Sequence, residues 1–166
     1  MPDAFDVLGL PAKFDLTPGE VRAAYLARVG AGGGGNKAEG GSGEEGDAAL
    51  NAAKMTLSDP EARANLLLSR FGGPSKEVSR DLPDGFLMQM MEVREDLEAA
   101  AERGDRAGVE KWLAWAEKER DGYVAQVGEL FRRYETERSG KVLSEIRKTL
   151  NAWRYIERMV EQMEAL

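Results

Sequence analysis

Apolar residues recur at helical spacing over most of the chain, and glycine and proline interrupt them. A short apolar segment at residues 5–10 ends at Pro11, and Thr17-Pro18-Gly19-Glu20 then has the form of a helix start. Thr17 can cap this helix, and proline suits the first helical position. The run from Gly30 to Gly46 contains nine glycines. This run predicts a flexible loop, because glycine loses more backbone entropy in a helix than any other residue.

Two more helices are expected in the first half of the chain. One covers about residues 47–57, and the next begins at the Asp59-Pro60 pair, where Asp59 is a suitable cap. A Gly-Gly-Pro sequence ends that second helix. We therefore expect a first domain over residues 1–72 and a linker over residues 73–82.

The remaining residues, 83–166, carry three long amphipathic patterns, which lie at about residues 83–103, 105–138 and 141–165. Short loops between long helices favour antiparallel neighbours, so this domain is predicted to be an antiparallel three-helix bundle. Trp112 and Trp115 of the middle helix are interpreted as packing residues. The predicted fold class is all-α.

The composition excludes several classes of function. The chain has no cysteine and no histidine, which removes disulfides, thiolate metal ligands and the commonest general base. We therefore expect no enzyme activity, no metal and no cofactor. The net charge of −7 argues against nucleic acid as a partner. Without a signal-like start or a long apolar run, no membrane association is expected, and the predicted location is the cytoplasm.

One helix carries more apolar residues than its packing requires. At about 100° per residue, the 83–103 helix places one stripe on a narrow arc, formed by Phe86, Met90, Val93, Leu97 and Ala101. Other residues lie off that stripe, towards the far side of the helix: Leu87, Met88, Met91, Glu92 and Glu95. Exposed leucine and methionine beside carboxylates indicate an interaction surface. Alternatively, another helix of the same chain covers them. On the last helix, Tyr155 similarly falls away from the apolar stripe.

Three segments resemble the HscB-type J-domain co-chaperones of iron–sulfur cluster assembly. They are FDVLGLPAKFDL at 5–16, LNAAKMTLSDPEARANLLL at 50–68 and LPDGFLMQMMEVREDL at 82–97. The resemblance implies an L-shaped molecule, in which a J-domain precedes a three-helix, oligomerisation-type domain that binds the cluster scaffold protein. Carried over by position, the family's scaffold-binding face implies Leu87, Met88, Met91, Glu92, Glu95 and Tyr155. The cluster would belong to the partner, since this chain has no cysteine to bind iron.

The first domain departs from the family pattern. J-domains of this family carry a His-Pro-Asp tripeptide that activates the ATPase of an HscA- or DnaK-type chaperone, whereas this chain has no histidine. The expected position falls at about Gly32–Gly35, and only Arg22 and Arg28 supply positive charge between Pro18 and Gly30. We therefore expect a degenerate J-domain that does not stimulate a chaperone, unless the glycine-rich loop replaces the tripeptide. The rival interpretation is a structural module that self-associates through the Leu/Met residues.

Overall fold

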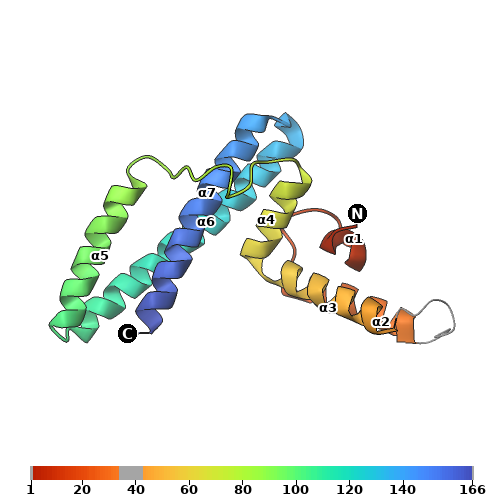
Figure 1. Cartoon of the computed structure of the whole chain (residues 1–166), viewed down its shortest axis with the longest axis horizontal. Coiled ribbons are helices and arrows are strands. Elements are labelled where there is room, and N and C mark those ends of the chain that lie inside the picture. Colours follow the sequence, from red (N-terminus) through yellow and green to blue (C-terminus); the bar gives the residue numbers. More distant parts are fainter. Residues whose placement is uncertain (1, 34–42, 166) are drawn as a thin grey trace. The chain divides into compact units, whose positions relative to one another are not determined.

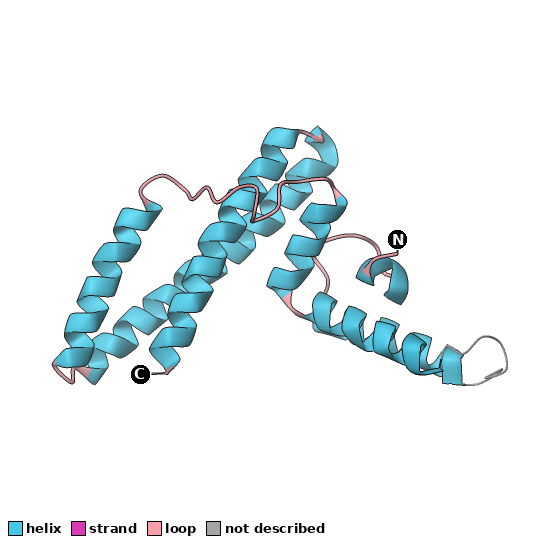
Figure 2. Ribbon diagram, viewed as in Figure 1, coloured by secondary structure: helices cyan, strands magenta, loops and turns pink. Residues whose placement is uncertain are grey.

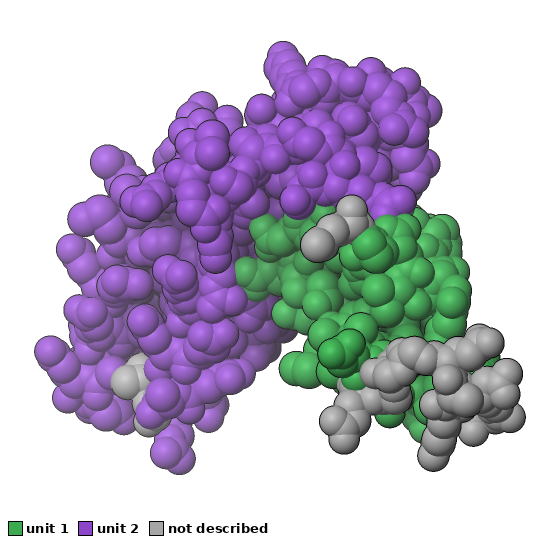
Figure 3. Space-filling model, turned by 45° about the vertical axis from the view of Figure 1, so that its right-hand side comes forward, with its two compact units in different colours: residues 1–67 green, residues 68–166 purple. Residues whose placement is uncertain are grey.

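The computed structural model describes residues 2–33 and 43–165 of the chain. All regular elements in that described part are α-helices, seven in number (Figure 2). The predicted all-α class is therefore confirmed. The chain divides into two compact units, Met1–Leu67 and Leu68–Leu166 (Figure 3).

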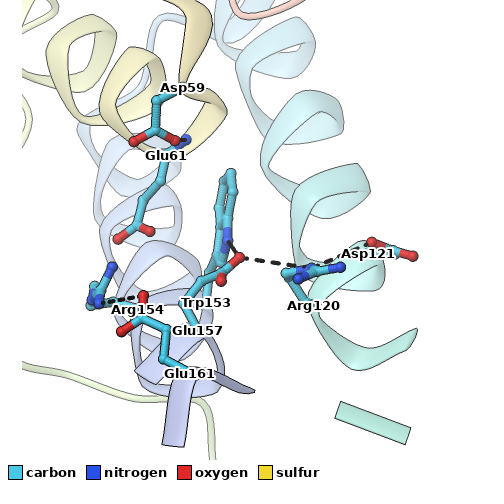
Figure 4. A network of polar contacts seen from close by, with 8 residues as sticks. All are labelled: Asp59, Glu61, Arg120, Asp121, Trp153, Arg154, Glu157 and Glu161. Carbon is cyan, nitrogen blue, oxygen red and sulfur yellow. Dashed lines mark hydrogen bonds and ion pairs between the residues drawn. The ribbon is translucent and has the colours of Figure 1, made fainter. Parts of the chain in front are cut away.

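The first unit contains α1 (Ala4–Leu8), α2 (Pro18–Gly33), α3 (Gly43–Ser58) and most of α4 (Pro60–Arg70). The expected cap of α2 is present, because the Thr17 hydroxyl oxygen accepts a hydrogen bond from the backbone N–H of Glu20 at 3.1 Å. Asp59 caps α4 in the same way, accepting from the Glu61 N–H at 3.1 Å (Figure 4). Apolar side chains of α1, α2 and α3 form the core of this unit, among them Phe5, Val21 and Leu57.

The glycine-rich run is more helical than expected. Residues 30–33 continue α2 and residues 43–46 begin α3, so the predicted loop over 30–46 is wrong at both of its ends. A glycine costs about 1 kcal/mol relative to alanine inside a helix, and packing between helices can offset that cost. Here α2 and α3 are joined by a hydrogen bond from the Tyr25 hydroxyl to Asn51 Oδ1 at 2.8 Å. The middle of the run, residues 34–42, lies outside the described residues.

The second unit begins within α4, earlier than the boundary expected after residue 72. Phe71, which directly follows α4, explains this division. Its ring centroid lies 6.2 Å from that of Phe131 and 4.9 Å from that of Tyr134, both on α6. The end of the first expected domain therefore packs as part of the bundle.

Three helices, α5 (Phe86–Glu102), α6 (Arg106–Glu137) and α7 (Gly140–Glu164), form the second unit as predicted (Figure 1). Between α5 and α6 the chain turns at Gly104, which has a φ of 68°, and Asp105 caps α6 by accepting from the Gly108 N–H at 2.9 Å. Between α6 and α7 the turn passes through Arg138, with a φ of 49°, to the α7 cap Ser139. These short turns make successive helices antiparallel.

One apolar cluster joins all three helices, with contributions from α5, from Ala116 of α6 and from α7. Trp112 and Trp115 are partly buried against it, which confirms their interpretation as packing residues. A polar network borders the contact between α6 and α7 (Figure 4). In it, Trp153 Nε1 donates to Glu157 Oε1 at 3.2 Å, and Arg120 Nε lies 3.7 Å from the same oxygen. Within the described residues, no helix is both long and apolar enough to cross a membrane.

Candidate partner-binding face

Helix α5 positions the candidate site. It begins directly after Gly85, whose φ of 75° directs the chain into the helix and which supplies no side-chain cap. One stripe of α5 is buried in the bundle, formed by Phe86, Met90, Val93, Leu97 and Ala100. The last residue differs from the expectation: Ala100 is buried and Ala101 is exposed. Positions three and four residues apart share a helix face, and here the last turn packs through the three-residue spacing.

The predicted apolar surplus is exposed. Leu87, Met88 and Met91 expose 51%, 71% and 58% of their surface, and we call these three residues the Leu/Met face. No described part of the chain covers them, so the alternative that a neighbouring helix buries them is wrong. Full burial of such a side chain contributes roughly 1.5–3 kcal/mol, and this chain leaves that contribution largely unused. The other exposed large apolar residues of the described part lie outside α5: Leu26, Val29, Met55 and Val78.

Two carboxylates lie beside the Leu/Met face on the same helix. Glu92 and Glu95 are exposed. Neither side chain forms a hydrogen bond or salt bridge with another described residue. Two unpaired negative charges next to an apolar surface suit a partner that offers apolar residues ringed by lysine or arginine.

Tyr155 of α7 contacts the first residue of α5, Phe86. Its ring meets the Phe86 ring edge-on, with centroids 5.5 Å apart and planes at 87°. The Arg94 guanidinium lies 5.8 Å from the centroid of the Tyr155 ring, within range of a cation–π interaction. The structure therefore brings Tyr155 to the helix that carries the other five predicted residues, although the two segments are far apart in sequence.

Sequence reasoning missed two neighbours of this site. Arg94 of α5 is one of them, and its contact with the Tyr155 ring depends on how α7 packs against α5, which no local pattern in the sequence indicates. The second is Tyr123 of α6, which contacts Phe86, with ring centroids 6.0 Å apart. Burial, reinforced by the charge of Glu119, raises the pKa of the Tyr123 hydroxyl. Phe86 thus contacts aromatic rings from both other helices of the bundle.

Residues 82–164 match the family model described as the HSCB C-terminal oligomerisation domain. The chain belongs to the HscB family of co-chaperones. The matched region begins at Leu82 and spans all three helices of the bundle, including the Leu/Met face and Tyr155. The family predicted from the three sequence segments is therefore confirmed.

Solved structures of HscB proteins share the fold over nearly the whole chain. The chaperone HscB from Vibrio cholerae matches with a TM-score of 0.75 and 23% identity, covering 99% of this chain and 96% of its own. The human co-chaperone protein HscB matches with a TM-score of 0.76 and 19% identity, covering 99% of this chain and 82% of its own. At these identities the likeness establishes the fold, including the helical domain that precedes the bundle.

The arrangement on α5 is suited to binding. No group of His, Cys, Asp or Glu within the described residues could hold a metal ion. The exposed side chains of α5 are apolar groups and carboxylates on one helix, and such a set can form a packed, charge-complementary contact with another macromolecule. A rigid helix also loses little conformational entropy on binding, which favours affinity.

Proposed function

We propose that this HscB-family chain is a co-chaperone of iron–sulfur cluster assembly that binds the cluster scaffold protein. The contact is made by the Leu/Met face together with Glu92, Glu95 and Tyr155. One observation supports this site above others: three large apolar side chains stand exposed within five residues of a helix whose opposite stripe is buried. That pattern has no use in the fold of the chain itself.

The three apolar residues supply the affinity in this proposal. Interface anchors of this type typically contribute about 1–2 kcal/mol each when truncated to alanine. Methionine adapts its shape to a partner, because its side chain is unbranched and polarisable. The two carboxylates act over a longer range and orient a positively charged patch of the scaffold protein during approach.

The first unit serves in this proposal as a helical support that does not stimulate a chaperone. The chain contains no histidine and so cannot present a His-Pro-Asp tripeptide. Its basic surface on α2 is also small. Of Arg22 and Arg28, the second has its guanidinium packed against Gly9 at the end of α1. This contact leaves Arg22 as the arginine of α2 best placed to attract an acidic chaperone surface.

Binding of the triple variant Leu87→Ala, Met88→Ala, Met91→Ala tests the site. Titration calorimetry with the organism's own scaffold protein, in its cluster-free form, should show at least a hundredfold loss of affinity, since three anchors together exceed about 3 kcal/mol. Met55→Ala is the matched control, because Met55 is 75% exposed on α3 of the other unit. It should bind as wild type does. A folded triple variant that binds as tightly as wild type would remove this site.

Self-association through the same face is the second candidate function. The matched family domain is described as an oligomerisation domain, which favours it. Sedimentation velocity over a range of protein concentrations distinguishes the two. A monomer at the concentrations where the scaffold binds supports the first function. A dimer that the triple variant dissociates supports the second.

A further inference from the structure

The start of α5 is held by the segment before it. Gly85 makes no side-chain capping hydrogen bond, so the helix that carries the Leu/Met face lacks the usual device for fixing its first turn. The preceding residues, 79–85, form no regular helix. Their position must therefore be set by contacts with the rest of the bundle.

Asn151 of α7 supplies such contacts. Its side-chain Nδ2 donates to the backbone carbonyl of Ser79 at 3.1 Å and to that of Asp81 at 2.9 Å. A side-chain amide has two N–H donors, and both are used on the same short segment. Leu82, the next residue after Asp81, packs against the apolar cluster of the bundle. The segment that leads into α5 is therefore attached to the bundle by the hydrogen bonds of Asn151 and by the packing of Leu82.

Arg147 fixes the orientation of this amide. Its Nε donates to Asn151 Oδ1 at 3.1 Å, and the arginine is buried, with 5% of its surface exposed. Rotating the amide by 180° would place its oxygen against two carbonyl oxygens and its NH₂ group against a guanidinium. Both contacts would be repulsive, so one orientation is strongly preferred.

We propose that Asn151 is a positioning residue for the partner-binding face; this rests on the proposed function. Asn151 and Tyr155 lie one turn apart on α7. By attaching residues 79–81 to α7, Asn151 holds the first turn of α5 in place next to Tyr155. Leu87 and Met88 belong to that first turn. Holding them in place before the partner arrives reduces the entropy lost on binding, and so raises affinity.

Two substitutions test this role. Asn151→Asp keeps the size of the side chain and its acceptor for Arg147, but removes both donors and places a carboxylate opposite two carbonyl oxygens. Asn151→Ala removes all three hydrogen bonds. In both variants, amide hydrogen exchange should become at least tenfold faster in residues 82–90, and affinity for the cluster-free scaffold protein should fall about tenfold, or 1.4 kcal/mol.

The control Val142→Ala separates positioning from general stability. Val142 is buried on α7, outside the cluster that includes α5. It should lower the melting temperature while leaving exchange in residues 82–90 and the affinity unchanged. In wild type, both side-chain NH₂ protons of Asn151 should exchange slowly in NMR spectra, which a role in packing alone would not require.

Each outcome decides the matter. Unchanged affinity in a folded Asn151→Asp variant, or unchanged exchange in residues 82–90, overturns the positioning role. An equal loss of affinity in Val142→Ala overturns it as well. If the Leu/Met triple variant binds normally while Asn151→Asp still accelerates exchange in residues 82–90, the scaffold contact is wrong and the attachment of α5 by Asn151 stands.

Discussion

Phe86 and Tyr155 are joined by an edge-to-face contact between their rings, with centroids 5.5 Å apart. Phe86 is 3% exposed and belongs to the core, whereas Tyr155 is only partly buried. The contact therefore links the interior of the bundle to the surface where the Leu/Met face lies. Phe86 also directly precedes Leu87 on α5. It therefore positions both Tyr155 and the start of the Leu/Met face.

Truncating the buried stripe of α5 should unfold the site, in contrast to truncating its exposed face. Phe86→Ala and Leu97→Ala each remove a buried side chain and leave a cavity, so we expect losses of about 2–5 kcal/mol in the free energy of unfolding. Met88→Ala, at an exposed position of the same helix, should change it by less than about 0.5 kcal/mol. Urea denaturation followed by circular dichroism measures all three. Equal losses at buried and exposed positions would contradict the assignment of the two faces.

Glu92 and Glu95 should act on the rate of association more than on the strength of the final contact. Both are exposed and form no ion pair with the described part of the chain, so their field is available to a partner. The variant Glu92→Gln, Glu95→Gln should slow association several-fold and flatten its salt dependence. Stopped-flow binding at several salt concentrations tests this, with Glu129→Gln on α6 as a control. A salt dependence identical to that of wild type would exclude steering by these carboxylates.

The buried Arg63 should be essential to the first unit. Its Nε donates to the Phe14 carbonyl at 2.8 Å, and Nη1 donates to the Leu57 carbonyl. Arg63→Met keeps much of the apolar volume but leaves both carbonyls without this partner, so we expect a loss of about 2 kcal/mol or more in unfolding free energy. Arg22→Met, at an exposed position of α2, is the control. A melting curve of Arg63→Met that coincides with that of wild type would show that other groups replace these bonds.

Stability should fall at high pH in part because of Tyr123. Burial, and then the charge of Glu119, raise the pKa of its hydroxyl above the ordinary value of 10.0. The unfolded chain therefore loses this proton first, and unfolding becomes more favourable as pH rises from about 10 through the folded-state pKa. Tyr123→Phe cannot ionise and should lose less stability over that interval. Parallel denaturation series at pH 8 to 11 would reveal the difference, and identical slopes for the two proteins would contradict it.

Much of the fold was predictable from local pattern. The long helices follow from periodic apolar residues, and their ends follow from residues such as Gly104 and Ser139 that turn or cap the chain. The glycine-rich run was predicted less well, because packing between α2 and α3 outweighs the low helix propensity of glycine. Exposure of Leu87, Met88 and Met91 could not be decided from one helix, since it depends on where the other helices lie. The contacts of Asn151 with residues 79 and 81 carry no local signal, because they join segments about 70 residues apart.

We expect that the first unit does not activate a chaperone. Adding this protein to an HscA- or DnaK-type chaperone should leave the steady-state ATPase rate unchanged. A His-Pro-Asp tripeptide offers an aspartate on a turn made rigid by its neighbouring proline, and glycines offer neither the charge nor the rigidity. Any glycine-rich segment that docked on a chaperone would also lose conformational entropy, at about 1–2 kcal/mol per ordered residue.

A J-domain protein with an intact tripeptide serves as the positive control in this assay. The assay uses the wild-type chain, so that the first unit is folded. Stimulation of several-fold that disappears when residues 30–46 are deleted would contradict the predicted loss. In that case Asp47, or the carboxylate pair at 44 and 45, would be the first groups to substitute, because they are the acidic residues expected to replace the missing aspartate.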